Sequence, residues 1–285
     1  MSIRFENVFY TYNKNSPFAS SALKNVNLEM KDGEFVTIIG HTGSGKSTLV
    51  QQINSLLRPT EGKIEVGDFV ISANEKKTKG LKKLKKYAGL VFQFPEYQLF
   101  EESVLKDVAF GPKNFGDDEE KSLEKARAAL KAVNIEEELF DKSPFELSGG
   151  QKRRVAIAGI IALEPDILIL DEPTAGLDPR GSKEMMELFE KIHQNGTTII
   201  MITHDMNMVL HHASRAVVMS EGEIIYDGLP HDLFLKDNLE KDYHIDIPMV
   251  LEFAKSLKLK GLNIDLHKVI NVETLIEEIR RVYHG

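Results

Sequence analysis

Residues 40–47 read Gly-His-Thr-Gly-Ser-Gly-Lys-Ser, which matches the phosphate-loop pattern GxxxxGK[ST]. The apolar run Phe35–Ile39 precedes the motif, and the helical pattern Lys46–Leu57 follows it. In that setting the glycines let backbone N–H groups turn toward a phosphate, and the helix N-terminus adds partial positive charge. Lys46 would reach the β- and γ-phosphates, and the Ser47 hydroxyl would bind Mg²⁺. An ordinary glycine-rich turn would match by chance in roughly one such chain in a hundred.

A second apolar run, Ile167–Leu170, ends in two acidic residues, Asp171 and Glu172. Ligands of open α/β sheets bind at the carboxyl ends of the strands, so Asp171 is expected near the Mg²⁺. Glu172, one residue on, could act as a general base on a water molecule. Two acids after a strand more often form a cap or a turn. Beside a phosphate loop, they predict hydrolysis of a nucleoside triphosphate.

The remaining pattern predicts a mostly parallel α/β sheet. Strands alternate with helices, and several strands are apolar throughout, which is typical of strands covered on both faces. The expected strands are Phe35–Ile39, Ile64–Val66, Phe69–Ile71, Leu90–Phe92, Ile167–Leu170, Thr197–Ile202 and Ala216–Met219, and the expected helices are Lys46–Leu57, Asp118–Val133, Gln151–Leu163 and Pro179–Gln194.

Three further segments suggest how the chain is divided. Residues 112–147 carry a charged helical stretch and no strand signal, so we expect a small helical insertion there. A hairpin pattern over 217–226 would close the main domain. After about residue 231 the sequence is amphipathic and helical, and Asn271 has the position of an N-cap.

Composition excludes several classes of protein. The 285 residues include no cysteine, which rules out disulfides, thiolate metal sites and cysteine nucleophiles. The net charge of −8 argues against a general nucleic-acid binder. No apolar stretch approaches the roughly 20 residues needed to cross a bilayer, and the N-terminus does not resemble a signal peptide. We therefore expect a soluble, cytoplasmic chain that meets a membrane only through partners.

A short motif, Leu147-Ser148-Gly149-Gly150-Gln151, narrows the function. Ser148 and Gln151 have the spacing of a capping box, so a helix should begin here. Two adjacent glycines at a helix start expose backbone N–H groups to an anion. Taken alone, the segment would be an ordinary capped helix.

Together with the other motifs, this segment makes residues 1–230 resemble the ATP-binding cassette (ABC) family. The family's motifs occur here in the family's order. The resemblance implies a P-loop NTPase fold with a RecA-like α/β core, an N-terminal antiparallel β part and a helical subdomain at about 112–165. Residues 231–285 would form a small C-terminal helical extension that serves as a dimerisation region.

The resemblance also implies a set of site residues. Tyr12 would stack on adenine, Gln93 would form the Q-loop, His204 would be the switch histidine, and Asp178 would belong to the D-loop. The expected nucleotide-binding residues are Tyr12, Gly40, His41, Thr42, Gly43, Ser44, Gly45, Lys46, Ser47 and Thr48. The catalytic residues would be Glu172, His204 and Gln93, and the Mg²⁺ ligands Ser47, Gln93 and Asp171. The signature residues Leu147, Ser148, Gly149, Gly150 and Gln151 would act on the ATP of a partner cassette.

Each of the isolated residues also has a purely structural interpretation. Tyr12 and His204 could be packing or surface residues, and Gln93 could be a polar strand end. Asp178 before Pro179 is typical of a helix N-cap followed by proline at N1. The other eight histidines, including the pair His211 and His212, are interpreted as structural.

Residues 92–100, Phe-Gln-Phe-Pro-Glu-Tyr-Gln-Leu-Phe, suggest what the ATPase drives. Clustered aromatics and a proline indicate either an exposed docking surface or a locally packed loop. The segment resembles the Q-loop region of energy-coupling factor (ECF) transporter ATPases, which power import of vitamins or transition-metal ions into prokaryotic cells. His41 and Thr42 resemble the second of the two paralogous ATPases of that group.

That resemblance implies three partners. A second paralogous ATPase would complete a heterodimer with ATP between the two chains. A transmembrane coupling protein would dock near 92–111, and a separate membrane subunit would bind the substrate. The chain would then be a peripheral protein at the cytoplasmic face of a prokaryotic cell membrane, with ATP and Mg²⁺ as its cofactors and no nucleic-acid partner.

Several alternatives stay open. A cobalt or nickel importer, or another ABC transporter, would carry the same motifs. A soluble ABC ATPase of DNA repair is disfavoured, because such ATPases separate the two half-motifs by a long coiled coil, whereas Lys46 and Ser148 are only about 100 residues apart with no heptad run between them. A translation factor is disfavoured, because those proteins usually hold two cassettes in one chain and this sequence has one. A non-hydrolysing regulatory subunit is disfavoured by the presence of Glu172 and His204.

A lysine-rich run precedes the strand at Leu90–Phe92. The preferred interpretation is a solvated face of the protein. The alternative is a surface that binds anionic lipid or nucleic acid. The seven lysines are Lys76, Lys77, Lys79, Lys82, Lys83, Lys85 and Lys86.

Overall fold

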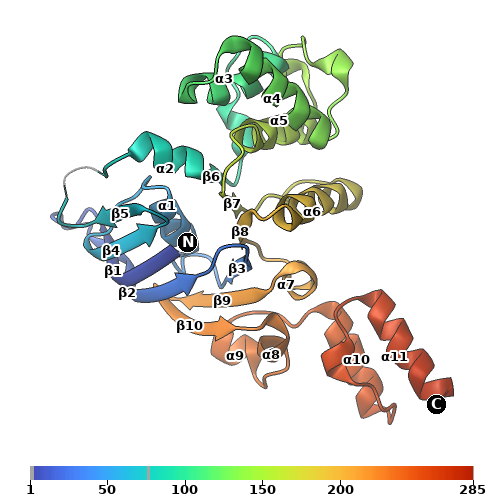
Figure 1. Ribbon diagram of the computed structural model, residues 1–285. Coiled ribbons are helices and arrows are strands. Elements are labelled where there is room, and N and C mark those ends of the chain that lie inside the picture. The colour runs from blue at the N-terminus through green and yellow to red at the C-terminus, as the bar shows by residue number, and fades with distance from the viewer. Residues whose placement is uncertain (1–2, 76–77, 285) are drawn as a thin grey trace.

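The computed structural model describes residues 3–75 and 78–284, and its main element is a six-stranded sheet with the order β10-β9-β3-β8-β7-β6 (Figure 1). Its strands pair in parallel except for β10, which runs antiparallel to β9. The strands are β3 (Phe35–Ile39), β6 (Ala88–Val91), β7 (Ile167–Asp171), β8 (Thr198–Ile202), β9 (Arg215–Ser220) and β10 (Glu223–Gly228). Every residue of β3, β6, β7 and β8 is buried, which explains why these runs are apolar rather than alternating.

A second, antiparallel sheet with the order β2-β1-β4-β5 is built from the N-terminal part of the chain. Its strands are β1 (Ile3–Tyr12), β2 (Ser20–Met30), β4 (Glu61–Val66) and β5 (Phe69–Ser72). β1 and β2 are additional to the predicted strands, and in β1 the alternation of apolar and polar residues is interrupted after Phe5, where the pairing with β2 shifts register. Helix α1 (Lys46–Ile53) shares one apolar core with both sheets, through Leu49 and Ile53.

Three helices form a separate cluster around their own core, which contains Leu130, Phe140 and Val155. They are α3 (Val104–Phe115), α4 (Glu119–Ala132) and α5 (Gly149–Ile161), with 3-10 turns at Glu137–Leu139 and Pro144–Glu146. The cluster begins earlier than expected, since residue 112 lies inside α3. Pro112 is tolerated near the end of that helix, which stops at Gly116 in a left-handed conformation with φ of 113°.

The helices that cover the sheet follow the predicted pattern with small shifts at their ends. The predicted helix Pro179–Gln194 is confirmed as α6, whose residues Met185, Met186 and Phe189 are buried. α1 ends at Ile53 rather than at Leu57, because Ser55 adopts a left-handed conformation with φ of 57°. The short helices α2 (Leu81–Tyr87) and α7 (Met206–His212), together with a 3-10 turn at Pro95–Gln98, complete this part of the chain.

Between β10 and His284 the chain is mostly helical. The helices are α8 (Pro230–Phe234), α9 (Leu239–Tyr243), α10 (Met249–Leu259) and α11 (Val272–His284), with a 3-10 turn at Leu266–Lys268. They share a core with α7 and β9, which includes Val209, Val218, Phe234 and Leu251. The predicted cap is confirmed, because the Thr274 amide donates to Asn271 Oδ1 at 2.9 Å. Helices α10 and α11 project from the sheet (Figure 1).

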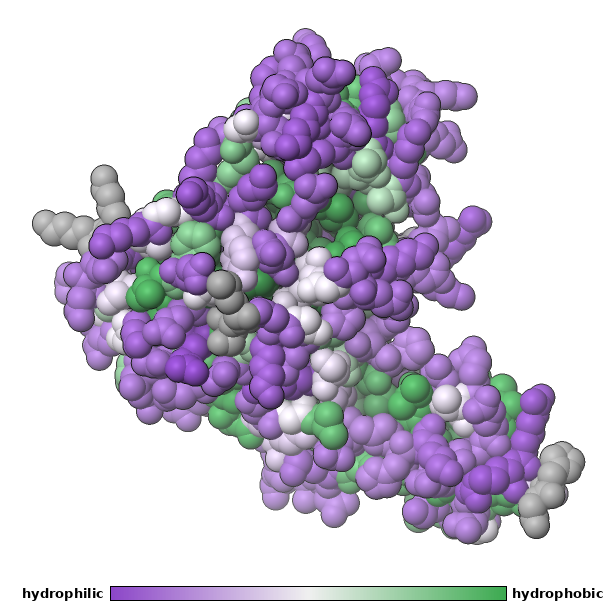
Figure 2. Space-filling model, in the orientation of Figure 1, coloured by the Kyte–Doolittle hydropathy of each residue, from purple (hydrophilic) through white to green (hydrophobic). Residues whose placement is uncertain are grey.

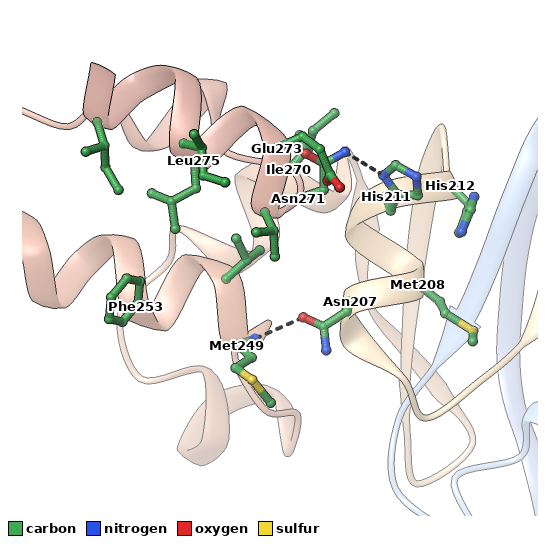
Figure 3. A pocket seen from close by; sticks show the side chains of 14 residues that line it. Asn207, Met208, His211, His212, Met249, Phe253, Ile270, Asn271, Glu273 and Leu275 are labelled. Carbon is green, nitrogen blue, oxygen red and sulfur yellow. Dashed lines mark hydrogen bonds between the residues drawn. The ribbon is translucent and has the colours of Figure 1, made fainter. Parts of the chain in front are cut away.

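The surface is mostly hydrophilic on the face shown in Figure 2. Hydrophobic residues gather between the helical cluster and α6, and again at the base of the C-terminal helices. Among the described residues, no helix is long and apolar enough to cross a bilayer. An apolar groove of about 720 Å³ lies between α7, α10 and α11 (Figure 3).

Because Phe189 is completely buried beneath the sheet, we expect Phe189→Ala to lower the free energy of unfolding by about 3–5 kcal/mol. Chemical denaturation of the purified chain measures this loss. Phe18→Ala is the matched control, since Phe18 is 82% exposed and its truncation should change the free energy of unfolding by less than about 0.5 kcal/mol. Equal effects of the two substitutions would contradict the packing described for α6.

Candidate nucleotide-binding site

The phosphate loop between β3 and α1 can be built only with glycine at two of its positions. Gly40 and Gly45 have φ values of 139° and 103°, a region that side-chain-bearing residues rarely adopt. A Cβ atom at Gly40 would lie 2.1 Å from the carbonyl oxygen of Met219. A Cβ atom at Gly45 would lie 2.5 Å from the carbonyl oxygen of Ala22. The backbone of neighbouring strands therefore fixes the shape of the loop.

Lys46 folds back over this loop. Its Nζ donates to the carbonyl oxygens of Gly40 at 2.8 Å and His41 at 2.9 Å, and the residue is almost completely buried. Burial lowers the pKa of Lys46, while the nearby carboxylates of Glu172 and Asp171 act in the opposite direction. The Ser44 hydroxyl is also buried, with no hydrogen-bond partner among the described residues. The loop thus carries a cation and an unpaired hydroxyl that fit an anionic phosphate.

Asp171 is the last residue of β7 and is buried. Burial raises the pKa of its carboxyl group, whereas a hydrogen bond from the Ser47 side chain lowers it. Ser47 and Asp171, predicted from separate motifs, are therefore adjacent. Hydroxyl and carboxylate oxygens are ligands that Mg²⁺ accepts.

Glu172 brings together the three residues expected to be catalytic. Its Oε2 accepts a hydrogen bond from Gln93 Nε2 at 2.7 Å, and its Oε1 lies 2.9 Å from His204 Nε2. The backbone supports this position, since the Glu172 amide donates to the Ile202 carbonyl at 3.0 Å. Glu172 also adopts a left-handed conformation with φ of 51°, which is uncommon for a residue with a side chain. His204 remains half exposed, so this group is open to solvent.

The buried Arg153 of α5 was missed by the sequence analysis. Its guanidinium donates to the carbonyl oxygens of Gln93 at 2.7 Å, Glu172 at 2.8 Å and Pro173 at 2.9 Å, and also to Ala175. One side chain therefore joins the segment after β6, the segment after β7 and the helix that follows the signature motif. The Lys152-Arg153-Arg154 run is the only sequence signal, and it does not show which of its members is buried.

Tyr12 lies beside the phosphate-loop helix. Its hydroxyl is 3.0 Å from Thr48 Oγ1, and its ring packs edge-to-face on Tyr10. The Tyr12 side chain is 39% exposed, so part of the ring is available to a ligand.

The signature segment lies at the start of α5, in the helical cluster. The capping box is confirmed, because the Ser148 amide donates to Gln151 Oε1 at 2.9 Å and the Gln151 amide donates to Ser148 Oγ at 3.3 Å. α5 packs against α3 and α4 in the helical cluster, away from the phosphate loop (Figure 1). A Cβ atom at Gly149 would meet nothing within 4 Å, so packing within the chain does not require this glycine.

Asp178, the residue expected in the D-loop, is the N-cap of α6. Asp178 caps α6 through its Oδ1, which accepts from the Gly181 amide at 2.6 Å.

Four aromatic side chains after β6 and on α3 are exposed and form two ring contacts. They are Phe94 with Tyr97, and Phe100 with Phe110.

The lysine-rich run lies mostly on α2, where Leu84 is the buried residue. Lys82, Lys83 and Lys85 are exposed, and Lys82 Nζ lies 5.8 Å from the Phe115 ring centroid. Lys76 and Lys77 lie outside the described residues.

The family model and the relatives that this chain matches are all ATP-binding cassette proteins. Residues 23–175 match the family model described as "ABC transporter". The chain is 54% identical over 259 residues to the energy-coupling factor transporter ATP-binding protein EcfA2 of Lactococcus lactis subsp. cremoris, covering 91% of this chain and 90% of the relative. It is 50% identical to the Bacillus subtilis protein of the same name, covering 95% and 98%.

Two solved structures are similar over most of the chain. CbiO1 from Clostridium perfringens, described as part of the ABC transporter complex CbiONQ, is 41% identical with a TM-score of 0.71. That match covers 83% of this chain and 92% of the other. The ATP-binding cassette MJ0796, dimeric and bound to ADP and Pi, is 33% identical with a TM-score of 0.71, covering 80% and 98%.

The contacts of Arg153 predict that it positions Gln93 and Glu172, two of the residues expected to be catalytic. We expect Arg153→Lys to lower kcat for ATP hydrolysis by about 10- to 100-fold, because an ammonium group cannot span four carbonyl oxygens. KM for ATP should change by less than about threefold, since Arg153 does not line the phosphate loop. Steady-state kinetics on the assembled ATPase measure both values. An unchanged kcat, or an equal change in kcat and KM, would contradict the positioning role.

Proposed function

The chain belongs to the ABC transporter family, and from this premise we propose that it is the ATP-hydrolysing subunit of an energy-coupling factor importer that takes up vitamins or other micronutrients. The observation that carries the proposal is the Glu172 carboxylate, held between Gln93 and His204 at the end of a strand beside the phosphate loop. This arrangement fits hydrolysis of a bound nucleotide rather than binding alone.

The residues of the loop supply binding and charge. Gly40–Thr48 would surround the phosphates with backbone N–H groups, and Lys46 would exchange its two carbonyl partners for β- and γ-phosphate oxygens. Tyr12 would hold the adenine. Mg²⁺, held by Ser47, Asp171 and the Gln93 amide oxygen, would neutralise charge on the phosphates.

Glu172 would orient the attacking water and accept its proton. Solvent reaches the group at the half-exposed His204, and the contacts of Glu172 with Gln93 and His204 limit the movement of the carboxylate. His204 would contact the γ-phosphate, and Gln93 would link the state of the nucleotide to the exposed aromatic segment that follows it in the chain.

The signature segment supports a site shared between two chains. The N-terminus of α5 is solvent-exposed at Ser148 and Gly149, and no atom of residues 3–75 or 78–284 lies within 4 Å of a Cβ built on Gly149. These features fit a nucleotide presented by a second, paralogous ATPase, with Leu147–Gln151 closing over its γ-phosphate and Asp178 near the shared boundary. Binding of ATP would then hold two chains together, and hydrolysis would release them.

Two exposed apolar surfaces support the remaining partners. The aromatic residues Phe94, Tyr97, Phe100 and Phe110 are suited to helices of a transmembrane coupling protein, which would also bring a substrate-binding membrane subunit. Residues 231–285 would contribute to dimerisation, as Val272 and Ile276 of α11 are exposed. The chain would thereby be held at the cytoplasmic face of the membrane, and specificity for a vitamin or a metal ion would lie in another subunit.

Removal of the proposed base tests the mechanism. We expect Glu172→Gln to lower kcat by about 10²–10⁴-fold and to retain ATP binding, because the amide keeps the shape of the carboxylate but cannot accept the proton. Turnover of radiolabelled ATP and the ATP-dependent mass of the ATPase dimer measure the two effects. Glu124→Gln, on the exposed part of α4, is the charge-matched control. Turnover by Glu172→Gln equal to that of the control would remove Glu172 from this role.

Native mass spectrometry of the complex, solubilised in detergent from its own membrane, tests the partners. We expect this chain together with a second ABC ATPase and two integral membrane proteins. A complex with two copies of this chain and a single type of membrane protein would favour a conventional transporter, and co-purified ribosomes or DNA would contradict the proposal.

A further inference from the structure

A second group of polar residues lies at the junction of α6, α7 and the C-terminal helices, and it is not used by the proposed function. Glu190 of α6 and His211 and His212 at the end of α7 each offer a ligand atom, and these atoms lie within 4.8 Å of one another. His212 Nδ1 is 2.7 Å from Glu190 Oε1. His211 is exposed, and its ring lies 4.4 Å from that of His212, at 76° to it.

We propose that Glu190, His211 and His212 form a binding site for a transition-metal cation of the Zn²⁺ class. The proposal rests on the convergence of the three side chains. Consecutive residues of a regular helix point in different directions, so two neighbouring histidines do not normally share a ligand. Here both are the final residues of α7, where their rings meet.

The donor set and spacing suit Zn²⁺ better than Mg²⁺ or Ca²⁺. Two imidazole nitrogens and one carboxylate oxygen are a common set of zinc ligands, whereas the alkaline-earth ions prefer oxygen alone. In a tetrahedral zinc site, ligand atoms about 2.0–2.1 Å from the metal lie about 3.3 Å apart. The His212–Glu190 contact would therefore open by about 0.6 Å, and His211 would move inward by a side-chain rotation. A water molecule would take the fourth position.

The surroundings of His212 favour its neutral imidazole, the form of histidine that binds a metal. Burial lowers the pKa of His212, while Glu190 and Asp205 raise it and His211 lowers it further. Burial thus favours the uncharged imidazole, which is the form that binds a metal. No thiolate competes for a thiophilic metal, because the chain lacks cysteine.

The site lies next to the start of the C-terminal helix α11. The Asn271 side chain, which caps α11, lies 3.4 Å from His211 Nδ1 (Figure 3). A metal held here would join α6 to α7 and would take the lone pair of His211, so it would replace the contact between His211 and Asn271. The site does not depend on the function proposed above, since none of its three residues belongs to the phosphate loop or the Glu172 group.

Calorimetric titration of Zn²⁺ into the metal-free full-length chain tests the proposal. We expect one saturable site per chain, and at least about tenfold weaker binding in the variants Glu190→Gln and His212→Gln, because each loses a direct ligand. His204→Gln is the matched control, since it removes the other histidine–glutamate contact of the described chain and should leave Zn²⁺ binding unchanged. Loss of binding in the control alone would place the zinc at the nucleotide site and overturn the proposal, as would the absence of a saturable site.

A second measurement uses the unmutated chain, in case a variant does not fold. Diethyl pyrocarbonate modifies neutral histidines, and mass spectrometry locates the products. We expect Zn²⁺ to protect His211 and His212 and to leave the exposed His267 reactive. Equal modification of His211 and His212 with and without Zn²⁺ would contradict the proposal.

Discussion

The close approach of three backbone segments at the phosphate loop is the constraint on which the rest of the structure depends. The carbonyl of Ala22, in the antiparallel sheet, lies against Gly45, and the carbonyl of Met219, in the parallel sheet, lies against Gly40. The Gly222 amide, in the β9–β10 turn, also donates to the Ser44 carbonyl at 3.0 Å. The loop is therefore held at the junction of both sheets, and its conformation is fixed before any ligand binds. This preorganisation matters because phosphate binding relies on the direction of the N–H groups.

Around this loop, buried groups of opposite charge offset one another. Desolvation lowers the pKa of Lys46 and raises that of Asp171, and each carboxylate near Lys46 opposes the effect on the lysine. Arg153 adds a third buried group whose hydrogen bonds go to carbonyl oxygens rather than to a single carboxylate. Such an arrangement keeps the Glu172 carboxylate close to positive charge without pairing it permanently with a cation. The carboxylate thus remains available to a water molecule, with a histidine and an amide as its neighbours.

Local patterns in the sequence were enough to predict the elements that carry the motifs. The strand Phe35–Ile39 and the helix Pro179–Gln194 agree with the structure at both ends, because a continuous apolar run and an Asp-Pro start are strong signals. The strands β1 and β2 and the helix α3 were not predicted. The alternation in β1 is interrupted where its pairing with β2 shifts register, and α3 contains Pro112, a residue that rarely lies inside a helix.

The parts of the sites that were missed depend on contacts between distant segments. Arg153 acts on carbonyl oxygens from two other parts of the chain, and nothing in its own neighbourhood indicates that it is buried. His211 and His212 were interpreted as structural, because Glu190 approaches them only in the folded chain. Side-chain contacts between distant segments leave no pattern in the residue spacing.

The short helix α7 has a mechanical consequence for the molecule. Helix α7 begins two residues after His204. Its second residue, Asn207, accepts a side-chain hydrogen bond from the Met249 amide at the start of α10. Helix α11 extends about 20 Å beyond its own contact with α7. A tilt of a few degrees in α7 would therefore swing the tip of α11 through more than an ångström, so a small displacement next to His204 would become a larger one at the end of the C-terminal helices.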